Sequence, residues 1–594
     1  METASRNGDV IRLLEEIGDL LEVKGELGFK VNAYRRAARS IEALNEDVAD
    51  LYVSGRLREI PGVGEALEQK ISEYLDTGRL GYLERLQAEF PAGLLTLLEV
   101  PGLGPRRARM LYDSLGIGSL TELEQAARAQ RLRGVSGFGE KVESNVLREL
   151  ERLKQRSRRL PLESGLEEAR AIIAQLGQRA PVDRATWAGS TRRMRETIGD
   201  VDILVVSSQP QAVTDAFCRL PRVVEVLSHG SQRASVLLRG GLQVDLRVVP
   251  AASWGAALQY FTGSKAHNVH LRELAARRGW TLNEYGLFEA DGERGAPRDG
   301  PPPGAPLAGE DEDELYRLLG LQPIPPELRE DEGEIEAAQQ GTLPVLVDAS
   351  DIRGDLHVHS DWTDGSAPLE AMAQAAIGRG YQYMAITDHT RSLGVTNGLD
   401  EGRVREQRAL VDRLNATLAP FRILLGTEMD IKRDGTLDLP DETLDVMDYV
   451  SVSIHSAMNQ PREQMTERII RALGNPYVTT LNHPRGRLLR RRDAYEVDLE
   501  RVIAVAAERG VALEVNAQPE RMDLDGGWVR RALRAGARLT ISTDAHAPGQ
   551  LAYLYLGVAS ARRGWATPAD VLNARPLEEI EEHLARRKAA ARGR

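Results

Sequence analysis

The sequence contains a single cysteine, Cys218, among 594 residues. One cysteine cannot form a disulfide within the chain, so we expect a reducing compartment in which Cys218 serves as a small buried hydrophobe. The sequence also lacks any run of about 18 apolar residues, the length that a membrane-spanning helix needs. Its first residues, METASRNGDV, have neither the basic start nor the apolar stretch of a secretory signal. We therefore expect a cytoplasmic protein with no membrane partner.

An excess of positive charge is absent as well. The formal net charge of -12 at pH 7 argues against a protein that coats nucleic acid through bulk positive charge, although local patches can still bind phosphate. Only 8 of the 77 basic residues are lysine, so each lysine is informative. Of the 10 histidines, six stand at the ends of strand-like segments after residue 350. The chain is too long for one core, and a prior of roughly 100 to 200 residues per domain predicts about three to five domains.

Residues 1 to about 155 show helical periodicity broken by glycine turns. An apolar residue, a G-x-G turn and a new helix recur in LREIPGVGEALEQKI (57–71), LLEVPGLGPRRARML (97–111) and RLRGVSGFGEKVESNV (131–146). The turn glycines are Gly62, Gly64, Gly102, Gly104, Gly137 and Gly139. The three copies resemble helix-hairpin-helix elements, in which backbone N–H groups at a helix N-terminus bind a DNA phosphate. Helical hairpins that only pack on each other are the alternative.

Strand-like runs alternate with helical stretches from 160 to about 250 and predict an α+β unit. Asp200 and Asp202 lie two apart on one strand, so their side chains leave the same face. Asp245 stands in the middle of another strand, where an unpaired charge is costly unless a cation compensates it. Three carboxylates that share two Mg²⁺ ions suit phosphoryl transfer, and the turn at Gly189 and Ser190 offers a phosphate cradle. Acids on a solvated strand edge are the alternative, but they would not explain the turn and the third acid.

The spacing of G-S and D-x-D resembles the nucleotidyltransferase signature, and YFTGS at 260–264 is similar to the family X DNA polymerases. The resemblance implies that the three acids bind two Mg²⁺ ions. It implies that an incoming deoxynucleoside triphosphate (dNTP) is held by Ser190, Arg193 and Arg159. It further implies that Tyr260 and Phe261 line the sugar, that Gly263 gives close backbone approach, and that Asn268 and Arg272 meet the base and the template side. Without the resemblance, the two aromatic residues would be read as core.

The segments FKVNAYRRAARSI (29–41) and LREIPGVGEALEQKISEYL (57–75) resemble the small N-terminal domain of the DNA polymerase beta branch. Lys70 matches the lysine whose amine attacks the C1′ aldehyde of an abasic sugar and expels the 5′-phosphate. Lys30 and Tyr34 match supporting positions, whereas Ala66 stands where efficient lyases carry a second phosphate-binding lysine. Two roles stay open for Lys70, a 5′-deoxyribose-phosphate lyase nucleophile or a plain phosphate anchor.

The last third of the chain alternates strand-like runs with helical patterns. The runs are IRGDLHVHS, YMAITDHT, RILLGTEMDI, YVSVSIHSA, YVTTLNHP, VALEVNAQ and RLTISTDAH. Seven strands joined by helices predict a parallel (β/α)7 barrel. The Pro-rich and acidic stretches before it predict a linker near 325–348.

Nine nitrogen and oxygen ligands stand at the ends of these strands: His357, His359, Asp364, His389, Glu428, His455, His483, Asp544 and His546. One histidine at a strand end is more often a satisfied polar group, but active sites of parallel barrels gather at the C-terminal ends of the strands. Imidazole and carboxylate without cysteine suit zinc, manganese or iron. The motifs resemble the polymerase and histidinol phosphatase (PHP) family over about 350–575. That resemblance implies a trinuclear site, with all nine ligands present, that hydrolyses phosphodiesters.

The sequence RGRLLRRR follows His483 and supplies Arg485, Arg487, Arg490, Arg491 and Arg492. Either it is a solvated charged face or it contacts a DNA backbone beside the metals.

We expect a multidomain protein with an all-α N-terminal region, an α+β palm and a PHP barrel. The expected ranges are a lyase-like helix-hairpin-helix domain (1–85), a DNA-binding helix-hairpin-helix domain (86–160), the palm (161–250), a nucleotide-selecting subdomain (251–324), the linker (325–348) and the PHP domain (349–594). This order resembles bacterial family X DNA polymerases.

The resemblance implies gap filling in DNA repair, with gapped or nicked double-stranded DNA and dNTPs as partners, by a monomer. It implies Mg²⁺ in the palm and Mn²⁺ or Zn²⁺ in a PHP 3′-5′ exonuclease or abasic-site (AP) endonuclease. A nucleotidyltransferase with a small-molecule phosphatase and a non-catalytic DNA-end scaffold are the alternatives. The three hairpins and YFTGS count against the former, and the intact ligand sets count against the latter.

Overall fold

The computed structural model describes residues 7–42, 48–91, 93–100, 103–290, 304–392 and 396–593. They form two compact units. One comprises 1–157, 360–368 and 389–400, and the other comprises 158–359, 369–388 and 401–594. Within the described ranges, no helix combines the length and the apolar character needed to cross a bilayer.

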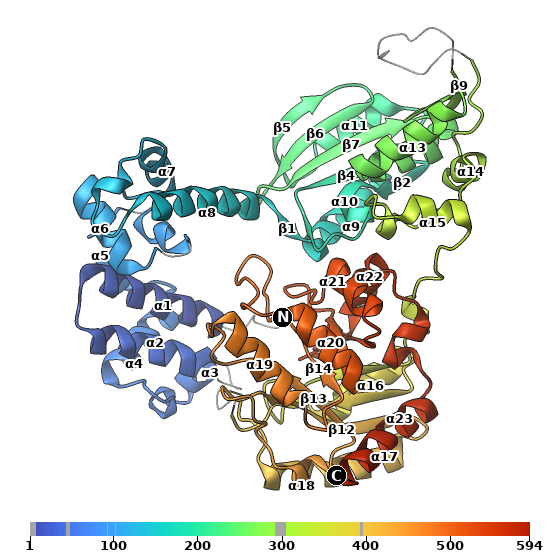
Figure 1. Cartoon of the computed structure of the whole chain (residues 1–594). Helices are drawn as coiled ribbons and strands as arrows, with labels where there is room; N and C mark the ends of the chain where they lie inside the picture. Colours follow the sequence, from blue (N-terminus) through green and yellow to red (C-terminus); the bar gives the residue numbers. More distant parts are fainter. Residues whose placement is uncertain are drawn as a thin grey trace. The chain divides into compact units, whose positions relative to one another are not determined.

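The N-terminal region is all α, as expected (Figure 1). Its helices are α1 (Asn7–Lys24), α2 (Gly28–Glu42), α3 (Val48–Val53), α4 (Glu65–Thr77), α5 (Gly81–Gln87), α6 (Pro105–Leu115), α7 (Leu120–Arg128) and α8 (Glu140–Arg158). Short 3₁₀ turns precede the three repeat helices: η1 (Leu57–Glu59) before α4, η2 (Leu94–Glu99) before α6 and η3 (Leu132–Gly134) before α8. Apolar residues of these elements pack into two cores, one built by residues 10–86 and the other by residues 94–150 together with Val23 of α1.

The predicted palm is a five-stranded sheet in the order β2-β4-β7-β6-β5. Its elements are β2 (Arg184–Trp187), α10 (Gly189–Arg192), β4 (Asp200–Val206), α11 (Pro210–Cys218), β5 (Val223–His229), β6 (Arg233–Leu238) and β7 (Gln243–Val249). Before it, β1 (Leu160–Pro161) leads into α9 (Leu162–Arg179) and pairs antiparallel with β3 (Thr197–Ile198). The sequence patterns predicted β2, β4, β6 and β7 but missed the exposed edge strand β5.

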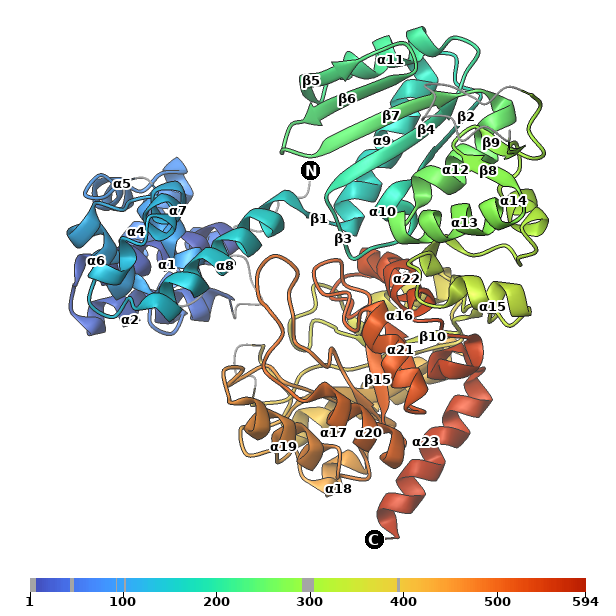
Figure 2. The ribbon, with the colours of Figure 1, turned by 45° about the horizontal axis from the view of Figure 1, so that its top comes forward.

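The two faces of this sheet have different surroundings. Helices α9 and α11 cover one face, where Val201 of β4 and Val244 of β7 are buried in a shared apolar core (Figure 2). Because side chains alternate along a strand, Asp200, Asp202 and Asp245 leave from the opposite face. The palm acids therefore stand on the face opposite α9 and α11, where Leu204 of β4 packs further along against Ala257 and Leu258 of the following helix.

The next subdomain packs around a separate core. It contains α12 (Trp254–Thr262), α13 (Lys265–Arg277), the hairpin β8 (Trp280–Asn283) and β9 (Gly286–Glu289), and α14 (Glu312–Leu318). The segment 325–348, expected as a linker, differs from that expectation because it holds η5 (Pro326–Leu328) and α15 (Glu334–Gln340). Its Leu328, Ile335 and Leu346 are buried with apolar residues of α13 and α14. The acidic composition of the segment concealed these spaced apolar residues.

The C-terminal part is the predicted parallel barrel. Its strands are β10 (Gly354–Val358), β11 (Tyr383–Ile386), β12 (Arg422–Asp430), β13 (Tyr449–Ser453), β14 (Thr480–Leu481), β15 (Ala512–Asn516) and β16 (Leu539–Ser542). All neighbours pair in parallel and in chain order, and a parallel bridge between Val358 and Ala545 nearly closes the ring. The helices are α16 (Leu369–Gly378), α17 (Glu401–Leu418), α18 (Asp441–Leu444), α19 (Arg462–Ala472), α20 (Leu499–Arg509), α21 (Gly526–Arg534), α22 (Leu554–Arg563) and α23 (Leu577–Arg592).

Candidate active sites

The palm acids are adjacent because of strand register. Asp202 and Asp245 are direct partners on the parallel strands β4 and β7, and Asp200 lies two residues before Asp202. Gly189 leaves room for them, because a Cβ at this position would stand 2.1 Å from Asp202 Oδ2. Its φ of +58° also favours glycine. The G-S turn thus lies directly against the acid pair.

Crowding perturbs these carboxylates. Burial raises the pKa of Asp202 to about 7, and the charges of Asp200 and Asp245 add to the effect. Desolvation, followed by the charge of Asp245, also raises the pKa of Asp200. Asp245 is held by the Ser235 hydroxyl and by Gln243 Nε2, which lies 3.0 Å from its Oδ2. Acids placed in this way are stabilised by a cation, and their all-oxygen donor set fits Mg²⁺.

The candidate metal ligands lie closer together in the barrel than in the palm. In the part of the chain that the structure describes, three groups of His, Asp and Glu place their ligand atoms within 4.8 Å of one another. The three palm acids are not among those groups.

Arg193 joins the G-S turn to the YFTGS segment. Its Nη1 donates to the carbonyl oxygen of Thr262, and its Nε donates to Glu330 Oε1 at 3.1 Å. A Cβ at Gly263 would stand 3.1 Å from Arg193 Nη1, and Gly263 has a φ of +69°. The glycine therefore permits both the turn and the close approach of the guanidinium.

The residues expected around the sugar and the base lie together on α12 and α13. The rings of Tyr260 and Phe261 meet edge to face with centroids 5.2 Å apart. Asn268 donates from Nδ2 to the Tyr260 carbonyl oxygen at 2.6 Å and accepts from Gln259 Nε2 at 2.7 Å. Arg272 Nε donates to the carbonyl oxygen of Asn268 at 3.2 Å. The Asn268 amide is thus engaged within the protein in this conformation.

The two other predicted phosphate contacts are Arg159 and Ser190. Arg159 donates from Nε to Thr197 Oγ1 at 2.9 Å and also contacts the Thr197 carbonyl oxygen. The carbonyl oxygen of Ser190 accepts from the Arg195 backbone N–H at 3.1 Å. Both residues are half-buried near the acids.

The barrel brings a buried ligand set to the ends of its strands. His357 on β10 places Nε2 3.3 Å from Glu428 Oε2 and 3.4 Å from Asp544 Oδ1. His359 places Nε2 3.5 Å and 3.3 Å from the same two carboxylates. Four buried nitrogen and oxygen donors that face one point have the geometry of a metal site.

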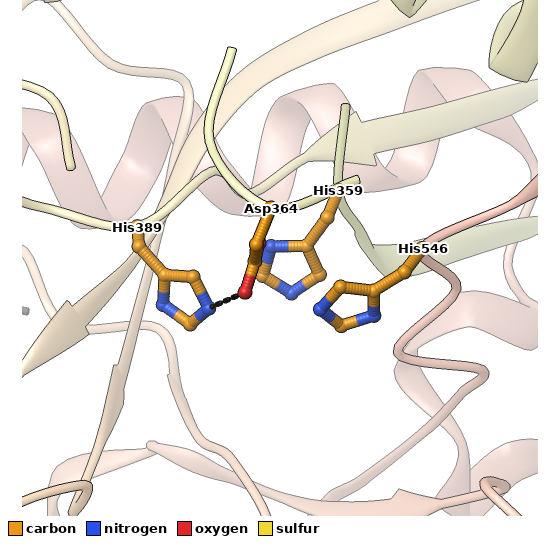
Figure 3. Close-up of side chains that lie close together, drawn as sticks. All are labelled: His359, Asp364, His389 and His546. Carbon is orange, nitrogen blue, oxygen red and sulfur yellow. Dashed lines mark ion pairs between the residues drawn. The ribbon is translucent and has the colours of Figure 1, made fainter. Parts of the chain in front are cut away.

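Two further groups share members with this set. They are His359, Asp364, His389 and His546, and His389, Glu428 and His455. Figure 3 shows the four-residue group, in which His389 Nε2 lies 3.2 Å from Asp364 Oδ2. His483 approaches through Nε2, 2.7 Å from Glu428 Oε1. Burial and then Arg521 lower the pKa of His483 to about 3, which keeps the ring in the neutral form that ligates metals. All nine predicted ligands are therefore near one another.

The sequence families that match the chain cover the same regions. A helix-hairpin-helix domain matches 5–80, a SAM-like helix-hairpin-helix tandem matches 94–152, the DNA polymerase beta thumb matches 257–330 and the PHP domain matches 355–518. DNA polymerase/3'-5' exonuclease PolX of Bacillus subtilis (strain 168) is 40% identical over 580 residues, which are 97% of this chain and 99% of that protein. The chain belongs to the bacterial family X DNA polymerases with a PHP domain.

Two other relatives are more distant. DNA polymerase lambda of Rattus norvegicus is 25% identical over 304 residues, 48% of this chain and 49% of that protein. A probable phosphatase of Acetivibrio thermocellus is 26% identical over 248 residues, 40% of this chain and 97% of that protein. The thumb match spans most of α12 and continues to η5, and the PHP match spans the barrel from β10 to β15. The thumb and hairpin matches also imply that the protein binds DNA.

Two buried acids of the PHP domain escaped the sequence analysis. Glu514 on β15 is fully buried and lies 2.6 Å from His357 Nδ1, which directs Nε2 toward the other ligands. Asp355 accepts from the His357 backbone N–H at 3.1 Å and from the Thr543 hydroxyl, and burial raises the pKa of Asp355 to about 6. A charge inside an apolar strand was the available signal, the same one that indicated Asp245.

The arginine cluster after His483 divides into two parts. Arg485 and Arg487 both contact Asp525, and Arg487 also donates to the Arg521 carbonyl oxygen at 3.0 Å. These two hold the loop on the PHP domain. The exposed residues 490–492 are the part that can meet a DNA backbone.

The glycine turns of the N-terminal hairpins start helices, as predicted. Gly62 and Gly137 have φ values of +91° and +81°, which favour glycine. Gly64 and Gly104 are the N-caps of α4 and α6, and glycine has no side chain that could cap the helix. Gly102 lies outside the described residues. Helix N-termini of this kind can bind a phosphate through backbone N–H groups.

Lys70 lies on α4 beside an aromatic pair. Its Nζ donates to the Ala66 carbonyl oxygen at 3.1 Å and stands 4.9 Å from the Tyr82 ring centroid. The Tyr82 ring stacks with the Tyr34 ring, with centroids 6.4 Å apart, whereas Lys30 forms an ion pair with Glu26. Burial lowers the pKa of Lys70. The structure thus brings Lys70 and Tyr34 to the same aromatic cluster.

Proposed function

We propose that the protein is a DNA-directed DNA polymerase that fills short gaps during repair, and that its PHP domain degrades DNA from the 3′ end. The observation that carries the proposal is the presence of two separate donor sets in one chain, carboxylates in the palm and imidazoles with carboxylates in the PHP domain. The Bacillus subtilis relative is named for both activities. We infer that the protein acts as a cytoplasmic monomer on gapped or nicked DNA.

In the palm, Asp200, Asp202 and Asp245 would hold two Mg²⁺ ions. When bound, the ions supply the charge that activates the 3′-hydroxyl and stabilises the leaving pyrophosphate. Ser190, Arg193 and Arg159 hold the triphosphate of a dNTP. Tyr260, Phe261 and Gly263 shape the sugar pocket, and Asn268 and Arg272 face the nascent base pair. These assignments are supported by the register of β4 and β7 and by the contact of Arg193 with the YFTGS segment.

In the PHP domain, the nine ligands would hold up to three ions. Donor sets that mix imidazole and carboxylate suit Mn²⁺ or Zn²⁺ better than Mg²⁺. Such ions supply an activated water for phosphodiester hydrolysis. We favour DNA as the substrate because the same chain carries three helix-hairpin-helix elements and the exposed arginines 490–492. Cleavage at abasic sites is a second activity that this site would support.

A phosphatase of small molecules is the other candidate for the PHP domain. It is favoured by the probable phosphatase of Acetivibrio thermocellus, 97% of which aligns with this chain. A phosphomonoester and a 3′-recessed DNA duplex offered at equal concentration separate the two. Hydrolysis of the monoester alone would support the phosphatase.

Separation of the two activities tests the proposal. Asp202→Asn removes one palm charge and should abolish primer extension on a gapped duplex while 3′ degradation continues. His357→Ala removes a PHP ligand and should do the reverse. Both reactions are measured on one labelled duplex, with Glu500→Gln, an exposed carboxylate of α20, as the control. Degradation that persists in His357→Ala and vanishes in Asp202→Asn would assign the nuclease to the palm.

A further inference from the structure

An arginine of the PHP domain reaches the nucleotide-binding side of the palm. Arg563, the last residue of α22, donates from Nη1 to the carbonyl oxygen of Arg193 at 2.8 Å and to Glu330 Oε1 at 3.1 Å. Its side chain is only 8% exposed. A buried cation with two such partners is held in one orientation, since an unpaired charge in that place would be costly.

Apolar packing fixes the end of α22 against the palm. Leu556 of α22 and Met522 of the same domain are buried in the core that α9, α11 and the palm strands build. Arg170 of α9 also stands over the Tyr555 ring at 5.6 Å. The position of Arg563 therefore follows from a packed contact rather than from a lone surface ion pair.

Glu330 is shared by three guanidinium groups. Its Oε1 lies 3.1 Å from Arg193 Nε, 3.5 Å from Arg195 Nη1 and 3.1 Å from Arg563 Nη1. Burial opposes the charged carboxylate, but Arg193 and Arg563 outweigh it and hold the pKa of Glu330 below its usual value. Three cations around one anion leave a positive excess, which suits a polyphosphate ligand.

The backbone contact of Arg563 lies at a constrained turn. The Arg193 N–H donates to the Gly189 carbonyl oxygen at 3.2 Å, and Met194 follows with a φ of +54°, a left-handed conformation that is uncommon for a residue with a side chain. A hydrogen bond from Arg563 to the carbonyl between these residues stabilises the turn from which the Arg193 side chain extends.

We propose that Arg563 is a positioning residue of the polymerase site, although it belongs to the PHP domain. It fixes the Arg193 main chain and shares Glu330, so that the Arg193 guanidinium is presented to the dNTP triphosphate instead of being held by Glu330 alone. The inference rests on the proposed role of Arg193 in triphosphate binding. It gives the PHP domain a part in synthesis that is separate from its own metal site.

Single-nucleotide insertion into a gapped duplex by the full-length protein tests the proposal. Arg563→Gln should raise the KM for dNTP about tenfold, equivalent to about 1.4 kcal/mol, and leave kcat and 3′ degradation within about twofold of wild type. Arg563→Lys keeps the charge, so the KM for dNTP should rise less in this variant than in Arg563→Gln. The matched control is Arg562→Gln, which removes the neighbouring contact between α22 and Glu327 at 2.8 Å and should leave the KM unchanged.

The outcomes separate this inference from the role on which it rests. If Arg193→Ala has a normal KM, the triphosphate assignment is wrong and the inference falls with it. If Arg193→Ala raises the KM but Arg563→Gln does not, only the inference is overturned. An equal rise in Arg562→Gln would show that the contact matters only for holding the domains together, which also overturns the inference. If Arg563→Gln lowers the melting temperature but leaves the KM for dNTP unchanged, the inference is also overturned.

Discussion

The contacts of Lys70 favour one of its two predicted roles. Its ammonium group donates to the Ala66 carbonyl oxygen and faces the Tyr82 ring, and both contacts stabilise the protonated form against the lowering of its pKa by burial. Ala66 also leaves this helix without a second lysine at the position where efficient lyases carry one. We therefore favour the phosphate anchor over the Schiff-base nucleophile.

The anchor role predicts that Lys70→Arg binds a gap with a 5′-phosphate about as well as wild type, because the charge is kept. Lys70→Ala should bind it roughly ten- to 100-fold more weakly, the order expected for one charge-assisted hydrogen bond. Fluorescence anisotropy with 5′-phosphorylated and 5′-hydroxyl gaps measures the difference. A covalent adduct trapped by borohydride on an abasic 5′-sugar in wild type, absent in Lys70→Arg, would establish the lyase instead.

Glu514 acts on the PHP site through His357, since it holds Nδ1 and thereby sets the tautomer and the direction of Nε2. Glu514→Gln keeps the shape but removes the charge, and it should weaken Mn²⁺ binding about 10- to 100-fold. Isothermal titration with Mn²⁺ and the metal dependence of 3′ degradation give the readouts. Primer extension by the same variant should be normal, and Glu500→Gln serves as the exposed-acid control. Unchanged Mn²⁺ affinity would show that Glu514 only fills the core.

At the scale of elements, the three hairpins differ in the charges beside their glycine turns. The helices α4 and α8 begin with two glutamates each in the first turn, whereas α6 begins with Pro105 followed by Arg106 and Arg107. Both arginines are exposed. Acidic residues near a helix N-terminus compete with a phosphate, so the second hairpin should contribute most to DNA affinity.

This difference predicts the effect of Arg106→Ala combined with Arg107→Ala. The double variant should bind duplex DNA about tenfold more weakly at low salt. The slope of the logarithm of its association constant against the logarithm of the salt concentration should become less steep by about one to two. Binding at several salt concentrations measures both quantities. Arg128→Ala, which removes an exposed arginine of α7 that pairs with Glu124, should have little effect. If Arg128→Ala lost as much DNA affinity as the double variant, the overall charge and not the second hairpin would govern binding.

At the scale of the whole molecule, the two donor sets should respond to different metals. After treatment with EDTA, Mg²⁺ should restore primer extension, because the palm offers only carboxylate oxygen. Mn²⁺ should be needed for full 3′ degradation, because the PHP site offers imidazole as well. Both activities are followed on one gapped duplex over a range of each metal. Restoration of degradation by Mg²⁺ to the level reached with Mn²⁺ would contradict the assignment.

The sequence alone predicted the fold class, and the structure confirms it. The seven barrel strands, the main palm strands and the three hairpins were all readable because each depends on local periodicity and on glycine at a turn. Domain boundaries stay predictions. The segment 325–348, expected as a linker, contains η5 and α15, because a few spaced apolar residues that averaged composition hides join the core of α13 and α14.

The sequence by itself determined which residues could do chemistry, because strand ends of a barrel and alternation along a strand place ligands by local rules. Their roles stay predictions. Only the tertiary structure decided which partners hold them. Glu514 meets His357 across 157 residues, and Arg563 meets Arg193 across 370. No local sequence pattern links residues so far apart. A buried charged group pairs with whichever opposite charge the packed interior brings next to it, and that neighbour depends on the tertiary fold.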